Sequence, residues 1–129
     1  MIYSFRITVP ANTPDTDPVR EELKLDKGVI RRLSIQIPPG HAGLCKFGIY
    51  RGDSQVWPKN TNEKFSGDGV LLTFDDEYFP ILQPPLSLFF VGWNEDELND
   101  HSVFIYFQLM TKEEYLSMKG VYWPEEGFI

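Results

Sequence analysis

Two histidines and one cysteine are the side chains that most readily suggest metal binding or nucleophilic catalysis in this chain. His41 lies in a turn rich in proline and glycine, and His101 lies where a predicted strand begins. Neither has another histidine or a cysteine at the spacing of zinc ligands. Cys45 stands among alternating strand residues, which indicates a buried thiol that packs as a small apolar group. We therefore expect no metal, no cofactor and no catalytic residues, and hence no enzyme.

Acidic side chains gather in residues 75–77 and 95–100, and carboxylates are the groups that calcium binding and glycoside hydrolysis require. Neither segment matches the calcium-loop pattern D-x-[DN]-x-[DN]-G, and nothing in the sequence sets the separation of a catalytic carboxylate pair. Solvated acidic loops are the favoured interpretation. Arg51, Gly52 and Asp53 spell the tripeptide that integrins recognise, but Gly-Asp is also ordinary turn chemistry, so we predict a turn.

Aromatic side chains suggest one alternative to a purely structural role. Trp57, Trp93 and Trp123, together with the tyrosines, could form a platform on which sugar rings stack. Such rings are equally common as anchors in cores and interfaces, and packing is the favoured interpretation. Carbohydrate binding through exposed tryptophan and tyrosine side chains stays open as the second functional hypothesis.

Charge and composition disfavour several classes of partner. Nineteen acidic side chains outnumber twelve basic ones, and the net charge of −7 disfavours binding to nucleic acid or to an anionic membrane. No apolar run approaches the roughly 20 residues of a membrane-spanning helix, and the N-terminus reads as a strand rather than a signal peptide. The length of 129 residues fits one domain with a substantial core.

The cleanest periodicity lies in residues 28–50 and predicts two strands. Apolar and polar residues alternate on either side of residues 38–40, Pro-Pro-Gly, where the ladder must stop because proline has no N–H to donate. Two such strands cannot stand alone in water, so other strands must cover their apolar face. The residues that this pattern places in the core are Leu33, Ile35, Ile37, Phe47 and Ile49.

Alternation and short apolar runs between turn residues predict further strands. Pro80 breaks residues 78–82, which predicts an edge piece or a loop. Thr111 as N-cap, with Glu114 three residues later, predicts one short helix that ends near Met118. About eight strands in all predict an all-β antiparallel β-sandwich in a single domain, 1–129, with an extended arm at 10–20 and a tail at 121–129. The further strands are expected at residues 3–9, 21–25, 55–57, 70–74, 86–93 and 102–110.

Two of these strands, residues 86–93 and 102–110, are apolar on both faces, which is more than a two-layer sandwich needs. The tail is likewise too apolar for a solvated segment. We predict self-association through the tail and one face of these two strands, taken as paired. In the competing interpretation the short helix and the arm cover that face within one chain. The expected contact residues are Phe89, Val91, Phe104, Tyr106, Tyr122, Trp123, Phe128 and Ile129.

The layout of the chain resembles that of small jelly-roll proteins of virions, which include phage head decoration proteins and other capsid-associated proteins. The resemblance is carried by the first strand, the proline-rich arm, the pair Gly-x-Ile…Ile-x-Ile-Pro-Pro-Gly and the late strand HSVFIYFQL. It implies a jelly-roll-like sandwich, homo-oligomers that are often trimers, attachment to a capsid lattice, and a location in the virion. We therefore expect a non-enzymatic structural protein.

Overall fold

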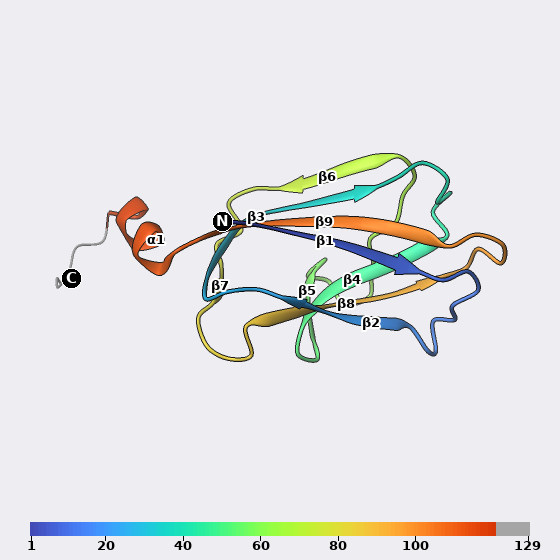
Figure 1. Cartoon of the computed structure of the whole chain (residues 1–129), viewed down its shortest axis with the longest axis horizontal. Helices are drawn as coiled ribbons and strands as arrows, with labels where there is room; N and C mark the ends of the chain where they lie inside the picture. The colour runs from blue at the N-terminus through green and yellow to red at the C-terminus, as the bar shows by residue number, and fades with distance from the viewer. Residues whose placement is uncertain (121–129) are drawn as a thin grey trace.

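The computed structural model describes residues 1–120, and within them nine strands and one helix form two antiparallel layers with a helix at one end (Figure 1). The elements are β1 (Ile2–Val9), β2 (Val19–Lys24), β3 (Gly28–Ile37), β4 (Cys45–Arg51), β5 (Ser54–Trp57), β6 (Val70–Phe74), β7 (Phe79–Ile81), β8 (Ser87–Asn94), β9 (His101–Met110) and α1 (Lys112–Met118). The predicted all-β sandwich is confirmed, with one strand more than the approximate count of eight.

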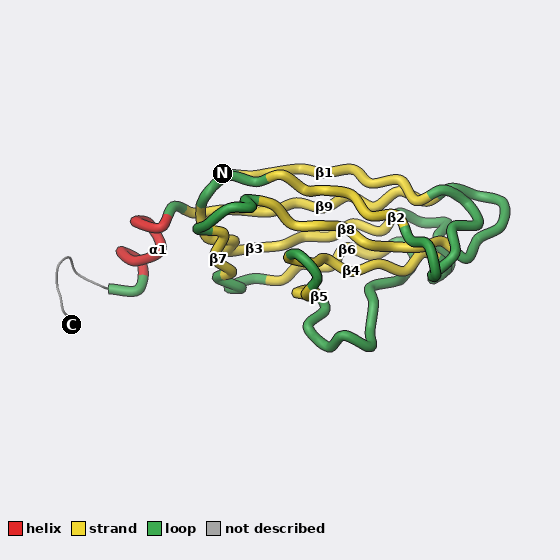
Figure 2. The backbone as a smooth tube through the Cα atoms, turned by 90° about the horizontal axis from the view of Figure 1, so that it is seen from below, coloured by secondary structure: helices red, strands yellow, loops and turns green. Residues whose placement is uncertain are grey.

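The strand order is that of a jelly roll. One layer, here called the β9 sheet, has the order β1-β9-β3-β6, and β7 also pairs with β3; the other, the β8 sheet, has the order β2-β8-β4-β5. The antiparallel pairs are nested: β4 with β5, β3 with β6, β2 with β8, and β1 with β9. The chain is thus one long ribbon whose successive pairs fall alternately in the two sheets, as in a jelly roll. Figure 2 shows the layers from below.

The core lies between the sheets and consists of the inward-facing residues of both. Because successive side chains of a strand point to opposite faces, β9 buries Val103, Ile105 and Phe107 and leaves the residues between them partly exposed. All five residues predicted for the core are at most 1% exposed, so that prediction is confirmed. The largest fully buried side chains are Phe47, Phe90 and Phe107.

The expected pairing of residues 86–93 with 102–110 is wrong. β8 pairs with β2 and β4, whereas β9 pairs with β1 and β3, so the two strands are central in different sheets. The segment between them crosses from one layer to the other. Asn94 fixes this crossing, because its side-chain amide donates to the carbonyls of Val9 at 3.2 Å and Asn99 at 2.9 Å.

The helix forms where the sequence predicts it. Thr111 Oγ1 accepts from the backbone N–H of Glu114, whose carboxylate accepts from the backbone N–H of Thr111, which completes a capping box. α1 buries no residue and lies beyond the end of the sandwich (Figures 1 and 2). No helix within residues 1–120 has the length and apolar character of a membrane span. The predicted tail, 121–129, lies outside the described residues.

Candidate functional site

The predicted contact residues lie on two opposite outer surfaces. Phe89 and Val91 belong to the outer face of the β8 sheet, and Phe104 and Tyr106 belong to the outer face of the β9 sheet. All four are half-buried, and their sequence neighbours fill the core. The structure therefore does not bring the two pairs together, because the core separates the sheets. The other four predicted contacts, Tyr122, Trp123, Phe128 and Ile129, fall outside the described residues.

The outer surface of the β8 sheet, which we call the β8 face, centres on Phe89, Val91 and Trp93. The guanidinium carbon of Arg20 lies 4.1 Å from the centre of the Phe89 ring. At the other end of the row, Trp93 Nε1 donates to Glu95 Oε2 at 3.2 Å. Lys46 Nζ donates to the same oxygen at 2.9 Å, and the two contacts, that of Lys46 above all, lower the pKa of Glu95. Charged groups thus frame an aromatic row, as in the rim and centre of many interfaces.

The outer surface of the β9 sheet, which we call the β9 face, centres on Phe104 and Tyr106. Phe104 lies between Arg6 of β1 and Gln36 of β3 in the sheet register, and the Arg6 guanidinium carbon is 5.8 Å from its ring centre. Toward the edges of this sheet the chain exposes two large aliphatic groups. Ile2 is 73% exposed and Leu71 is 65% exposed.

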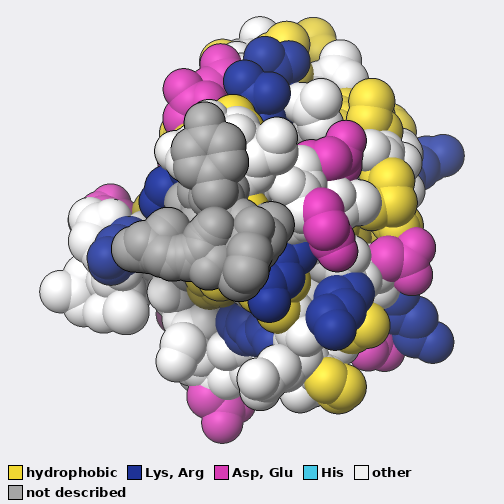
Figure 3. Space-filling view, turned by 90° about the vertical axis from the view of Figure 1, so that its left-hand side faces the viewer, with side chains coloured by type: hydrophobic (Ala, Val, Ile, Leu, Met, Phe, Trp, Pro, Cys, Tyr) yellow, Lys and Arg dark blue, Asp and Glu magenta, His cyan; other side chains and the backbone are white. Residues whose placement is uncertain are grey.

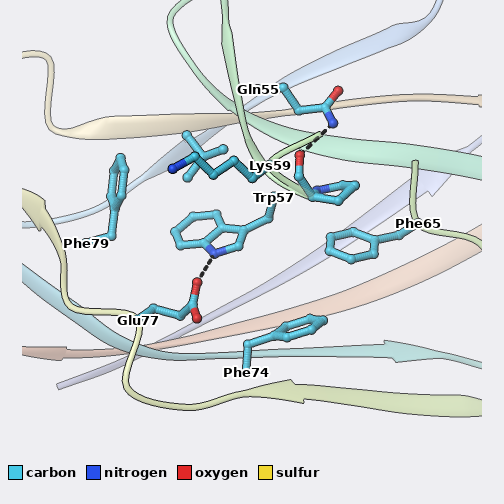
Figure 4. Close-up of a pocket in the computed structure, with 9 residues that line it drawn as sticks. Gln55, Trp57, Lys59, Phe65, Phe74, Glu77 and Phe79 are labelled. Atoms are coloured by element: carbon cyan, nitrogen blue, oxygen red, sulfur yellow. Dashed lines mark hydrogen bonds between the residues drawn. The ribbon is translucent and has the colours of Figure 1, made fainter. Parts of the chain in front are cut away.

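A pocket of about 510 Å³ opens at one lateral edge of the sandwich. We call it the edge pocket. Figure 4 shows the Trp57 indole at its centre, with Phe79 on one side and Phe65 and Phe74 on the other. Its walls come from β5, from the loop after β5, and from the β6–β7 region, which the sequence alone does not place together. The lining residues are Gln55, Val56, Trp57, Pro58, Lys59, Phe65, Phe74, Glu77 and Phe79.

Glu77 is held against the Trp57 side of this pocket. Trp57 Nε1 donates to Glu77 Oε1 at 2.6 Å. Asp76 and Tyr78, on either side of Glu77, adopt positive φ values of 58° and 51°, which non-glycine residues rarely do. The backbone N–H of Glu77 donates to the Arg31 carbonyl at 3.0 Å, so the loop is anchored to β3. The anchored backbone therefore holds the Glu77 carboxylate in position beside the Trp57 indole.

The opposite wall is held by Gln55, a polar residue that is only 9% exposed. Its amide nitrogen lies within 3.2 Å of the carbonyl oxygens of Pro58, Asn60 and Glu63, and so organises the loop after β5. Its amide oxygen accepts from the Tyr50 hydroxyl at 3.0 Å. Buried polar groups of this kind are costly unless they are paired, and their pairing here makes the pocket wall rigid.

The two histidines, which nothing in the sequence relates, meet at one end of the sandwich. Their ring centres are 4.4 Å apart. His101 Nε2 lies 2.9 Å from Asp96 Oδ2, and His41 Nε2 lies 2.9 Å from the Ser102 carbonyl. Burial above all lowers the pKa of His41, and the nearby His101 lowers it further. Within residues 1–120 no three His, Cys, Asp or Glu side chains converge as ligands of a metal ion.

The acidic segments lie in largely exposed loops, as predicted, and two of their carboxylates have defined partners. Asp75 pairs with Arg32, and Asp96 accepts from the backbone N–H of Leu98 and from His101, which together lower the pKa of Asp96 to about 2. The Arg-Gly-Asp tripeptide forms the turn between β4 and β5, as predicted. Cys45 is fully buried, as predicted, and burial raises the pKa of its thiol to about 11.

The three tryptophans do not form one platform. Trp57 is only 6% exposed and packs within the edge pocket, so packing is confirmed there. Trp93 lies half-buried on the β8 face, and Trp123 falls outside the described residues. The sequence matches no family model and has no significant match among curated proteins, so the assignment of a function depends on the chemistry of these surfaces.

Proposed function

We propose that this chain is a non-enzymatic structural protein that assembles with copies of itself on a larger protein lattice, as decoration and other capsid-associated proteins of virions do. The observation that carries the proposal is the presence of partly exposed aromatic rows on opposite sides of one subunit, the β8 face and the β9 face. A closed pair of subunits needs one self-complementary face, whereas two opposite faces let each copy contact two neighbours.

The composition of the two faces supports a role in protein contacts. Each has an arginine beside a phenylalanine, Arg20 at Phe89 and Arg6 at Phe104. Aromatic residues and arginine are the types enriched in interfaces, where the ring supplies buried area and the guanidinium supplies hydrogen bonds. The β9 face adds Ile2 and Leu71, whose exposed apolar area would be removed from water in an assembly.

The fold supports the same proposal by analogy. Jelly rolls with this strand order occur in viral capsid proteins and also in lectins, so the topology agrees with both functional hypotheses. Because a fold does not assign a function, the choice between them depends on the faces. We place assembly first, since Trp57 is packed rather than exposed for sugar stacking.

The experiment is sedimentation velocity on the intact chain and on variants that place a charge in each face. Val91→Glu disrupts the β8 face and Tyr106→Glu disrupts the β9 face, while Gln83→Glu adds the same charge at an exposed loop position as a control. Each face variant should reduce the assembly to a smaller species, and the double variant should give a monomer. An assembly whose mass is the same with both substitutions would contradict the proposal.

A further inference from the structure

β1 is an edge strand, and within residues 1–120 no other strand pairs with its second side. It lies at one end of the order β1-β9-β3-β6 and forms its ladder with β9. Figure 2 shows it along the upper border of the sandwich. An edge strand presents a row of N–H and C=O groups with which another strand can pair. We call this free side of the strand the β1 edge.

The register with β9 decides which backbone groups point to the β1 edge. The Met1 ammonium group donates to the Leu109 carbonyl at 3.0 Å, and the Leu109 N–H donates to the Met1 carbonyl at 2.7 Å, so these two residues form a bonded pair. Bonded and non-bonded pairs alternate along an antiparallel ladder, and the register of β1 with β9 has no shift. The odd-numbered residues of β1 therefore bond to β9. The free N–H and C=O groups belong to Ile2, Ser4, Arg6 and Thr8.

β1 has few of the features that keep edge strands apart. It is eight residues long, it contains no proline, and Arg6 is its one charged side chain. By contrast β2, at the edge of the β8 sheet, carries charge at four of its six residues, and Glu21 shares the inward face of the buried Leu23. Such charges prevent edge-to-edge pairing. Basic and acidic side chains are also interspersed at the end of the sandwich from which α1 leaves (Figure 3). The β1 edge is thus open to pairing, whereas β2 is protected.

We propose that the β1 edges of two copies pair as antiparallel strands about a twofold axis at Phe5, which joins their β9 sheets into one continuous sheet. All the free backbone groups then bond, because Ile2 faces Thr8 of the second copy and Ser4 faces Arg6 of the second copy. A ladder of this length buries less area than a stable interface needs. The inference therefore rests on the proposed self-association, in which the β8 face and the β9 face supply the remaining contact area.

The side chains of β1 are complementary to themselves in this register. Ser4 faces Arg6 on the outer surface, so the two guanidinium groups are not opposed. On the inner surface the two Phe5 residues form a non-bonded pair with Cα atoms about 4.5 Å apart, and aromatic pairs at such positions stabilise sheets. In one copy Phe5 is half-buried, with its ring centre 6.0 Å from that of Phe107. A shift by two residues would either oppose the two Arg6 side chains or leave Thr8 unpaired.

Charge and strand length favour a second β1 as the partner. The chain carries a net charge of −7, but β1 contains no carboxylate, so two β1 edges approach without acidic repulsion between them. β6, at the opposite edge of the same sheet, has five residues against the eight of β1. A β1–β6 ladder would therefore satisfy fewer of the free groups.

The decisive experiment is disulfide trapping between two variants of the full chain. Ser4→Cys and Arg6→Cys are prepared separately, mixed and oxidised. Facing residues of a bonded pair have Cα atoms about 5.5 Å apart, which a disulfide spans. The buried Cys45 thiol, whose pKa is raised to about 11, should not take part. We expect the mixed disulfide to form about tenfold faster than in the control, Ser4→Cys mixed with Glu22→Cys on the exposed side of β2, because pairing raises the effective concentration.

Charge at residue 4 tests the same register without a covalent bond. Ser4→Lys would oppose Arg6 of the second copy at both ends of the ladder and should weaken assembly by about two- to tenfold. Ser4→Glu would place a carboxylate at the same two positions and should strengthen assembly by a similar factor. Both substitutions alter an exposed side chain, so a general effect on folding would not give opposite signs. Sedimentation velocity measures the two changes.

The outcomes separate this inference from the proposed function. If the intact chain assembles but the mixed disulfide forms no faster than the control, the inference is overturned while the β8 face and the β9 face still carry assembly. A faster link of Ser4→Cys with itself would overturn the register, and a faster link of Ser4→Cys with Thr73→Cys would assign the β1 edge to β6 of the next copy. If the intact chain is a monomer, both proposals fail.

Discussion

Trp57 Nε1 donates a 2.6 Å hydrogen bond to Glu77 Oε1, and this bond joins the two sheets across an open edge of the sandwich. Trp57 ends β5 in the β8 sheet, whereas Glu77 lies two residues before β7 of the β9 sheet. No ladder hydrogen bond connects β5 to β6 or β7, since they belong to different sheets. The side-chain pair therefore fixes the distance between the layers at the edge pocket.

Replacing Glu77 by alanine should destabilise the fold by about 1–3 kcal/mol, because the indole N–H would lose its acceptor at a site that is only 6% exposed. Glu77→Gln keeps a carbonyl oxygen as acceptor and should cost less than half as much. Urea unfolding followed by tryptophan fluorescence measures both. Equal losses for the two variants would show that the negative charge, and not the hydrogen bond, matters.

Gly92 of β8 lies where no larger side chain fits. A Cβ there would be 2.8 Å from Phe47 Cβ and 2.9 Å from the Lys46 carbonyl oxygen, both closer than ordinary contact. Gly92→Ala should therefore cost about 1–3 kcal/mol through overpacking. Gly48→Ala, in the adjacent strand β4, is the matched control, because its nearest contacts would be at 3.4 Å. A measured loss as large for Gly48 as for Gly92 would contradict this explanation.

Ile35 is fully buried between the sheets, and its replacement by alanine should lower the free energy of unfolding by about 2–5 kcal/mol. Leu71→Ala removes a side chain of similar size that is 65% exposed and should change stability by less than about 1 kcal/mol. Denaturant titration of the two variants compares them directly. A loss under about half a kcal/mol for Ile35 would mean that this face is not packed as described.

The end of the sandwich that holds His41 and Asp96 should make stability depend on pH in two ranges. Burial lowers the pKa of His41, so the folded state favours the neutral ring. The contribution of this ring to the free energy of unfolding is complete above about pH 6.5 and decreases as the pH falls below that value. Hydrogen bonds from the Leu98 backbone and from His101 lower the pKa of Asp96 from 3.8 to about 2. The contribution of Asp96 to the free energy of unfolding is therefore complete above about pH 4 and is lost between about pH 4 and pH 2.

Two variants separate these ranges. His41→Gln should remove the decrease that begins near pH 6.5, and Asp96→Asn should remove a part of the decrease between pH 4 and pH 2 while leaving the upper range intact. Urea midpoints measured from pH 8 to pH 2 give both profiles. A profile for Asp96→Asn that runs parallel to the parent throughout would refute the role assigned to this carboxylate.

The strands could be predicted from the sequence because each one repeats its apolar residues with a period of two. Leu33, Ile35 and Ile37 show this most clearly, and all three lie in the core. The pairing of strands could not be predicted in the same way. β8 and β9 are both apolar on two faces, and that pattern does not say which sheet a strand joins.

The pairs of residues that form the candidate sites were even harder to predict, because they are brought together by contacts between distant parts of the chain. His41 and His101 meet only because the turn before β4 and the start of β9 lie at the same end of the sandwich. Trp57 and Glu77 meet only because β5 and β7 border the same lateral edge. No local spacing marks such pairs, whereas the capping box of α1, which spans three residues, was readable from Thr111 and Glu114 alone.

The molar mass of the intact chain in solution tests the central claim most directly. Sedimentation equilibrium over a wide range of protein concentrations should give a mass that is a multiple of 15.0 kDa and that falls toward 15.0 kDa only on dilution. The β8 face and the β9 face would then have partners in other copies. A mass of 15.0 kDa at every concentration would contradict assembly and leave the aromatic surfaces to some other ligand.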